Sequence, residues 1–120
     1  MKMRIIRFNE LSKQDRPDGR TVTKIVQQEL NQDVNSMQLL YVTHPRGLKE
    51  ILHSHEKSYE MLLFLDEANY RINNEDYHIN ANDFVIFEPG DVHGAIPIDH
   101  EVRIWAFQNP AIIDDKIIRE

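Results

Sequence analysis

Short runs of β-branched and aromatic residues, each followed within about 8–12 positions by turn-forming residues, constrain the fold of this sequence more than any other feature. The runs lie at 21–30, 36–44, 59–65, 69–80, 83–91 and 101–108. Roughly eight to ten short strands with regular turn signals are typical of a sandwich or a barrel. The sequence therefore predicts an all-β fold.

Individual segments give more specific expectations. The nearly continuous apolar run 59–65 favours a strand buried on both faces over a helix. Segment 69–80 predicts a hairpin, because Asn73 and Asn74 tolerate the positive φ of a tight turn. The polar segment 9–20 is expected to be a loop, and the tail 110–120 fits either a last strand or a short helix.

The size and charge of the chain exclude several classes of protein. At 120 residues, without an internal repeat, the chain is expected to form one domain. The net charge of −6 and the scattered basic residues argue against nucleic-acid binding. Its apolar runs are too short to span a membrane, and its N-terminus lacks the features of a secretory signal. The absence of cysteine excludes disulfides and thiolate chemistry. A soluble cytoplasmic protein is expected.

Two histidines and a glutamate, in the stretch HSHEKSYE, form a candidate metal site. In a strand, His53 and His55 point to one face and lie roughly 6–7 Å apart at Cα. Two imidazoles at that distance can converge on one cation with bonds of about 2.0–2.1 Å. A short turn then brings Glu60 alongside, and His93, after the Pro89-Gly90 turn, is the candidate fourth ligand. Three nitrogens and one oxygen suit several first-row metals.

The spacing of these residues resembles the two motifs of the cupins. The first motif corresponds to Gly47-x5-His53-x-His55-x4-Glu60, and the second to Pro89-Gly90-x2-His93. The resemblance implies a double-stranded β-helix (a jelly-roll barrel) formed by one cupin domain over residues 1–120, with motif one at 47–67 and motif two at 82–97. It also implies a divalent ion (Fe, Mn, Ni, Zn or Cu) held by His53, His55, Glu60 and His93. No catalytic residue is identified.

The sequence departs from the cupin motifs in their loops. Glu67 occupies the usual closing glycine of motif one, so the turn is expected to be rerouted through Asp66 and Asn69, since a left-handed non-glycine residue costs roughly 1–2 kcal/mol. Motif two opens with Asn82-Asp83, and Asn tolerates positive φ. Glu88 and Pro97 replace a proline and an asparagine. None of these changes affects a candidate ligand.

The resemblance leaves three functions open. The first is a metal-dependent enzyme of the dioxygenase, isomerase or decarboxylase type that acts on a small polar molecule. The second is a non-catalytic, sugar-like ligand-binding or sensor domain, because segment 53–94 is also similar to the effector-binding domain of arabinose-responsive transcription regulators. In that case the four residues form a hydrogen-bonded polar cluster. The third is a structural dimerisation module. A homodimer is expected in all three cases, with residues 3–8 able to cover a neighbour's sheet edge.

The remaining histidines and aromatic residues are assigned structural roles. His44, His78 and His100 lie at strand ends or in turns. The aromatic residues on predicted strands are expected in the core, and Phe64 could also form part of the cavity wall; they are Tyr41, Phe64, Trp105 and Phe107. Arg103 is expected to face outward, although an inward position would make it an anchor for an anionic substrate group.

Overall fold

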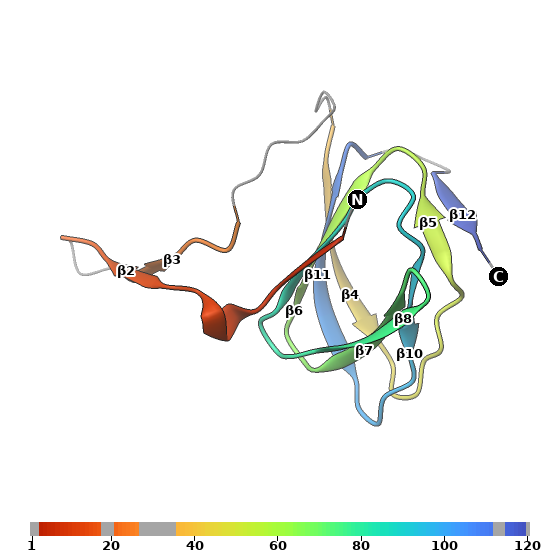
Figure 1. The fold of residues 1–120 in the computed structure, drawn as a ribbon, viewed down its shortest axis with the longest axis horizontal. Helices are drawn as coiled ribbons and strands as arrows, with labels where there is room; N and C mark the ends of the chain where they lie inside the picture. Colours follow the sequence, from red (N-terminus) through yellow and green to blue (C-terminus); the bar gives the residue numbers. More distant parts are fainter. Residues whose placement is uncertain (1–2, 18–20, 27–35, 112–114, 120) are drawn as a thin grey trace.

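The structure, a computed structural model, describes residues 3–17, 21–26, 36–111 and 115–119. Two five-stranded antiparallel sheets face each other and form a barrel (Figure 1). In spatial order the first sheet contains β1 (Arg4–Ile6), β9 (Phe84–Phe87), β6 (Tyr59–Phe64), β11 (Val102–Asn109) and β4 (Gln38–His44). The second contains β12 (Lys116–Ile118), β5 (His53–His55), β10 (His93–Ile96), β7 (Ala68–Ile72) and β8 (Glu75–Ile79). The predicted all-β jelly roll is confirmed.

The hairpin of β7 and β8 confirms the expected turn chemistry. Asn73 and Asn74, between the two strands, have φ values of 48° and 71°, which are the left-handed values of a primed hairpin turn. Asn82 also adopts a positive φ, 73°. Among the described residues no other non-glycine residue does so. Glu67 occupies the position of the motif glycine but does not adopt a left-handed conformation.

The turn after β6 is closed by an ion pair instead. Asp66 accepts hydrogen bonds from the Arg103 side chain at 2.9 and 3.0 Å and from the Arg103 backbone N–H at 2.9 Å. Half of the Arg103 side chain is exposed, which confirms that it faces outward. The predicted role of Asp66 in this turn is thus observed, whereas Asn69 lies within β7 and contacts His78 instead.

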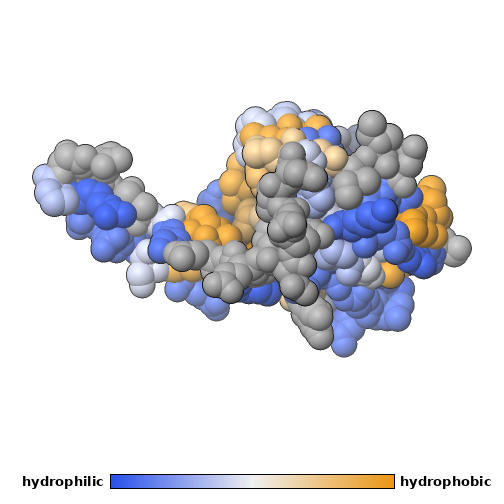
Figure 2. Space-filling view, turned by 90° about the horizontal axis from the view of Figure 1, so that it is seen from above, coloured by the Kyte–Doolittle hydropathy of each residue, from blue (hydrophilic) through white to orange (hydrophobic). Residues whose placement is uncertain are grey.

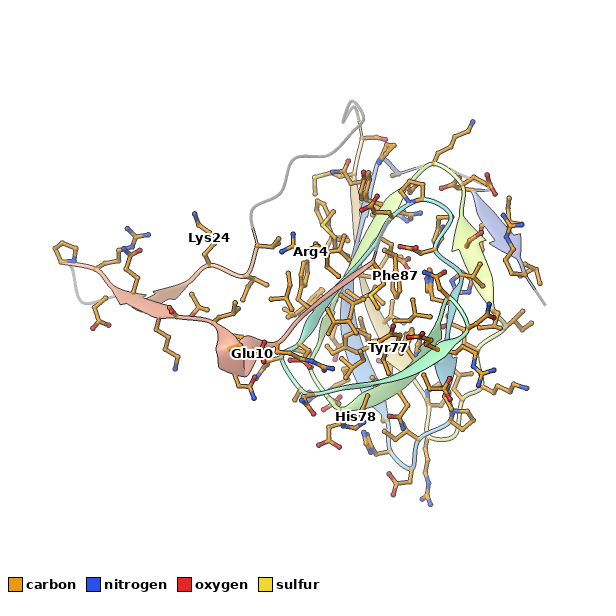
Figure 3. All side chains as sticks on the ribbon, in the orientation of Figure 1. Arg4, Glu10, Lys24, Tyr77, His78 and Phe87 are labelled. Carbon is orange, nitrogen blue, oxygen red and sulfur yellow. The ribbon has the colours of Figure 1, made fainter. Side chains whose placement is uncertain are left out.

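The main core lies between the two sheets. Phe64 and Phe87 are buried there against residues of both sheets, and Phe87 points into the barrel (Figure 3). The predicted core position of Tyr41 and Trp105 is wrong, because these side chains are 51% and 41% exposed. Side chains alternate along β11, so Ile104 and its even-numbered neighbours fill the barrel while Trp105 faces out.

The N-terminal segment differs from the expected loop. After β1 it forms a short 3₁₀ helix, η1 (Phe8–Glu10), and then pairs β2 (Lys13–Asp15) with β3 (Thr21–Thr23). This two-stranded arm projects from the barrel (Figure 1), and the described residues of its outer part are mainly hydrophilic (Figure 2). Lys24, just after β3, points away from the barrel (Figure 3). The strand predicted over 21–30 ends at Thr23, and its residues 27–30 lie outside the described residues.

Both ends of the chain complete the barrel sheets. Strand β1 pairs with β9 of the same chain, and its contact with a neighbouring chain stays a prediction. The tail forms a strand, β12, which pairs with β5. Strands β5 and β10 lie outside the runs that predicted strands. No helix in the described part of the chain is long and apolar enough to cross a membrane.

Candidate metal centre

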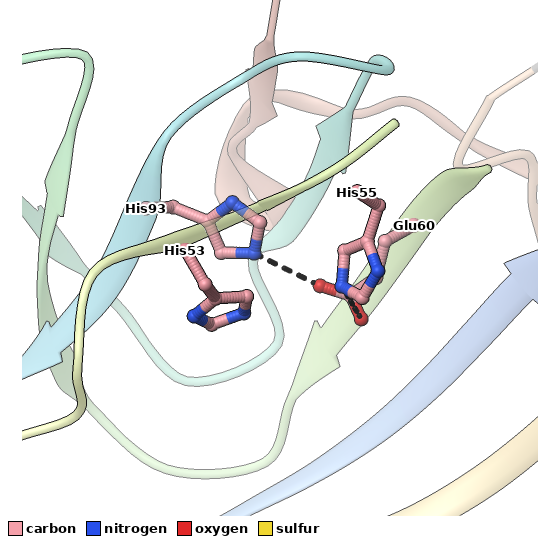
Figure 4. Close-up of side chains that lie close together, drawn as sticks. All are labelled: His53, His55, Glu60 and His93. Carbon is pink, nitrogen blue, oxygen red and sulfur yellow. Dashed lines mark hydrogen bonds and ion pairs between the residues drawn. The ribbon is translucent and has the colours of Figure 1, made fainter. Parts of the chain in front are cut away.

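Three strands bring the four candidate ligands together. His53 and His55 lie on β5, Glu60 on β6 and His93 on β10 (Figure 4). His93 is directly opposite His53 in the β5–β10 pairing. One donor atom from each of the four residues lies within 4.8 Å of all the others. Their convergence agrees with the sequence-based expectation, whereas ligation of a metal stays a prediction.

Glu60 lies between two of the imidazoles. Its Oε1 is 3.1 Å from His93 Nε2, and its Oε2 is 3.3 Å from His55 Nε2 (Figure 4). Burial by itself would raise the pKa of the Glu60 carboxyl, but hydrogen bonds and charge from the two imidazoles outweigh it and lower that pKa well below the ordinary value. The site therefore contains an ionised, partly buried carboxylate.

Two of the imidazoles are oriented by backbone carbonyl groups. His53 Nδ1 is 2.9 Å from the Ile51 carbonyl oxygen, and His93 Nδ1 is 3.0 Å from the Asp91 carbonyl oxygen. A carbonyl can only accept, so each Nδ1 donates its proton. In the neutral ring the Nε2 lone pair is then free, which is the arrangement found in metal-ligating histidines.

The contact between His93 and Glu60 provides a test of whether a metal fits. With Nδ1 protonated, a neutral His93 ring places its Nε2 lone pair 3.1 Å from a carboxylate oxygen. Two acceptors at this distance need a positive charge between or beside them, either a proton or a metal ion. The donor set of three imidazoles and one carboxylate is one that first-row divalent ions accept. The residues therefore fit such an ion.

The other two imidazoles differ in their electrostatics. Burial lowers the pKa of His53, and the neighbouring His93 adds to this effect, although the Ile51 carbonyl and Glu50 oppose it. For His55 burial also acts to lower the pKa, but hydrogen bonding and charge from Glu60 raise it overall. The neutral form, which a metal requires, is thus favoured at His53. At His55 the Glu60 carboxylate favours the protonated form.

The turn between β5 and β6 sets the distance from His55 to Glu60. Asp115, from the C-terminal tail, accepts the backbone N–H groups of this turn at 2.9–3.1 Å, from Glu56, Lys57 and Ser58. The Ser58 hydroxyl donates to the Pro110 carbonyl at 2.8 Å. This turn is thus held by a segment more than fifty residues away, which no local pattern could reveal.

The loop before β10 places His93. Gly90 has a φ of 93°, and its N–H donates to the His55 carbonyl at 2.8 Å. Asp91 accepts from the side chain of Asn73, at the tip of the β7–β8 hairpin, at 3.0 Å. The His93 ring stacks on Phe87 with 3.7 Å between centroids. Side-chain freedom at His93 is therefore small.

The four residues line a cavity of about 270 Å³ inside the barrel. Five apolar residues form part of its wall, and five further polar residues also line it: His44, Glu50, Tyr70, Gln108 and Lys116. The sequence analysis did not assign these to the site, although Gln108 shares the inward face of β11 with Ile104. Phe64 lies in the core and not in the cavity wall. His78 and His100 also lie outside the cavity.

The barrel fold and the cluster of three histidines and one glutamate together define the class of this protein. It is a β-barrel protein with a histidine–carboxylate centre inside the barrel.

Solved structures match this fold, whereas no protein-family model and no curated protein matches the sequence. An uncharacterised conserved protein with a double-stranded β-helix domain from Klebsiella pneumoniae has 22% identity and a TM-score of 0.64, covering 74% of this chain and 75% of that one. A cupin domain from Schizosaccharomyces pombe has 12% identity and a TM-score of 0.60, covering 84% and 86%. A DMSP lyase from Ruegeria pomeroyi DSS-3 has 19% identity and a TM-score of 0.62, covering 70% of this chain but 43% of the lyase. The chain has the double-stranded β-helix fold of the cupins.

Proposed function

We propose that this chain is a metal-binding cupin that acts as an enzyme on a small polar molecule bound in the barrel cavity. His53, His55, Glu60 and His93 would hold one divalent ion. The main support is the orientation of His53 and His93, whose Nδ1 atoms donate to carbonyl groups 2.9 and 3.0 Å away. This leaves the Nε2 lone pair of each ring free to bind a metal, and that of His93 lies 3.1 Å from the Glu60 carboxylate.

A divalent ion at this point would supply Lewis-acid chemistry to a bound molecule. The other cavity residues determine which molecule fits. A volume of about 270 Å³ limits the ligand to a small molecule. Apolar side chains from β4, β6 and β11 line part of the cavity, and Glu50, Tyr70 and Lys116 offer polar contacts.

Elemental analysis of protein purified without added metal tests the ligand set. We expect close to one divalent ion per chain in the wild type and its loss in a His53→Ala/His55→Ala variant. A His78→Ala/His100→Ala variant is the matched control, because it removes two histidines outside the cavity. Equal metal content in the wild type and the His53/His55 variant would contradict the proposal.

A second candidate function is a non-catalytic small-molecule sensor. The observation that favours it is the direct pairing of Glu60 with His55 and His93, which can satisfy the carboxylate without an ion. A thermal-shift screen with sugars and organic acids, run with and without a chelator, separates the two functions. Stabilisation that disappears with the chelator supports the metal-dependent function, and stabilisation that is indifferent to it supports the sensor.

A further inference from the structure

Two side chains that line the barrel cavity, Tyr70 and Lys116, have polar groups without a hydrogen-bond or ion-pair partner among the described residues. Tyr70, on β7, is only 2% exposed. Burial, together with the charges of Glu50 and Glu60, raises the pKa of Tyr70 well above its ordinary value, so the hydroxyl keeps its proton. A buried hydroxyl without a partner is costly. It therefore points to a hydrogen bond with a molecule bound in the cavity.

Lys116, on β12, supplies the cavity with a positive charge. It is directly opposite His55 in the β12–β5 pairing, so the two side chains lie on the same face of the sheet, and both line the cavity. Arg71, Arg103 and Arg119, in contrast, each form an ion pair with a carboxylate at 2.7–2.9 Å. A cation that faces a cavity without a carboxylate partner is suited to bind the anionic group of a ligand.

The strand order places these two groups on opposite sides of the histidine cluster. The second sheet runs from β12, which contains Lys116, through β5 and β10 to β7, which contains Tyr70. His55 and His93 lie on the two strands between them. Neighbouring strands are about 4.7–4.9 Å apart, so the backbones of Lys116 and Tyr70 are separated by roughly 14 Å at most. Both side chains reach inward, and a small molecule beside the histidines can therefore contact Lys116 with one end and Tyr70 with the other.

Glu50 adds a hydrogen-bond acceptor to the Tyr70 end of the cavity. Its backbone N–H donates to the Ala95 carbonyl at 3.0 Å, and its Oε1 accepts from the Ala95 backbone N–H at 3.0 Å. Ala95 is directly opposite Tyr70 in the β10–β7 pairing, so Glu50 and Tyr70 flank the same residue. The second carboxylate oxygen, Oε2, has no hydrogen bond with a described residue. A hydroxyl donor and a carboxylate acceptor together match an alcohol, which accepts from one and donates to the other.

The charges around the cavity favour a ligand with one negative charge. Of the described residues that line it, three are charged, namely Glu50, Glu60 and Lys116. Lys116 offsets one of the two carboxylates, so a divalent ion would leave one positive charge in excess, which a monoanion would neutralise. We propose that the cavity binds a small hydroxy acid, with its carboxylate on Lys116 and a hydroxyl between Tyr70 and Glu50. This inference rests on the function proposed above, because it assigns the ligand class of the same cavity.

Isothermal titration calorimetry of the full chain tests the proposal. The probes are glycolate, β-hydroxypropionate and γ-hydroxybutyrate, in which the hydroxyl lies at increasing distance from the carboxylate. For the tightest of them, the affinity should fall about tenfold or more when the hydroxyl is removed, or when an alcohol replaces the carboxylate to give the diol. The matched amino acid should also bind more weakly, because an ammonium group cannot accept the hydrogen bond from Tyr70.

Two substitutions separate the two ends of the ligand. Lys116→Met should lower the affinity for the hydroxy acid about tenfold or more and leave that for the diol unchanged. Tyr70→Phe should lower the affinity for the hydroxy acid and leave that for the acid without a hydroxyl unchanged. Tyr70→Phe should also keep the wild-type melting temperature, because the hydroxyl has no hydrogen bond with a described residue. Lys49→Met is the matched control, since Lys49 is exposed and lies outside the cavity.

A diol that binds as tightly as the hydroxy acid, an unchanged affinity in Lys116→Met, or no binding of any of the three hydroxy acids would overturn the proposal. Elemental analysis distinguishes these results from a failure of the metal-dependent function. If no ion is found but a hydroxy acid still binds through Lys116, the metal-dependent function fails and the ligand class stands. If the ion is present and the diol binds equally well, only the ligand class fails.

Discussion

Gln108 connects the histidine cluster to the edge of the first sheet. Its side-chain amide lies 3.4 Å from His55 Nδ1, and the Gln38 side chain on β4 donates to the Gln108 carbonyl oxygen. If His55 binds a metal through Nε2, its Nδ1 must hold a proton and needs an acceptor. The amide of Gln108 can meet this need by turning over and presenting its oxygen, provided that the Gln38 amide turns over as well and accepts from the Gln108 NH2 group.

Replacing Gln108 should therefore weaken metal binding without removing a ligand. Partners of metal-bound histidines typically contribute about 10–100-fold in affinity, and we expect Gln108→Leu to lower the affinity by about tenfold or more. Competition with a coloured chelator measures this change. Gln14→Leu, on the exposed strand β2, is the control. An unchanged affinity in Gln108→Leu would show that Gln108 does not position His55.

His44, at the end of β4, should contribute to the dependence of stability on pH. Burial lowers its pKa below 6.5, and the charge of Glu50 opposes this only in part. The other titratable group beside it is Tyr70, whose ring centroid is 6.4 Å away. Since the unfolded chain takes up a proton at His44 more readily, this contribution is complete above pH 6.5 and is lost as the pH falls.

The measurement is a series of thermal melts between neutral and mildly acidic pH. Below pH 6.5 the melting temperature of the wild type should fall more steeply than that of His44→Gln. His78→Gln, at an exposed position on β8, should follow the wild type. Parallel curves for wild type and His44→Gln would contradict the prediction.

Among the elements, the β7–β8 hairpin depends on two left-handed asparagines. Asn74 has a φ of 71°, which a residue with an ordinary side chain adopts at a cost of roughly 1–2 kcal/mol. We expect Asn74→Ala to lower the free energy of unfolding by about 1 kcal/mol, and Asn74→Gly to leave it unchanged or raise it. Urea unfolding measures both. Asn80→Ala, at a position without positive φ, is the control, and an equal loss there would contradict the backbone argument.

The turn between β5 and β6 depends on Asp115. Its carboxylate is buried and accepts three backbone N–H groups of that turn. Hydrogen bonds to charged groups contribute about 1.5–3 kcal/mol each, and their losses at one site are not additive. We expect Asp115→Ala to lower the free energy of unfolding by about 3 kcal/mol and also to weaken metal binding, because the turn sets the position of Glu60.

Urea unfolding and chelator competition measure these two effects of Asp115→Ala. Asp99→Ala is the matched control, since 89% of the Asp99 side chain is exposed. If Asp115→Ala destabilises the protein but leaves the metal affinity of the folded fraction unchanged, the turn does not determine the geometry of the site.

For the whole molecule, metal binding should stabilise the fold. The four candidate ligands come from three strands of both sheets, so they converge only in the folded chain. A ligand at about 100 times its Kd raises the free energy of unfolding by about 2.7 kcal/mol when only the folded state binds it. Removal of a divalent ion by a chelator should therefore lower the melting temperature. The same chelator should have no effect on His53→Ala/His55→Ala, and an equal effect there would point to metal bound elsewhere.

The sequence by itself determined the local features of this protein. Alternation along a strand places His53 and His55 on one face, and the Asn73-Asn74 pair predicts the hairpin, because both effects depend only on neighbours in the chain. The position of His93 followed from the resemblance to the cupin motifs. Local patterns could not separate inner from outer aromatic residues, since alternation shows which residues share a face of a strand but not which face is buried.

The tertiary structure decided which side of each strand faces the barrel and which distant groups support the site. Asp115 holds the β5–β6 turn, and Gln108 contacts His55 across more than fifty residues of sequence. Such contacts arise only when the two sheets close on each other, because a strand alone has two equivalent faces until packing buries one of them. The positions of Lys116 and Tyr70 on opposite sides of the histidine cluster are likewise a property of the final strand order.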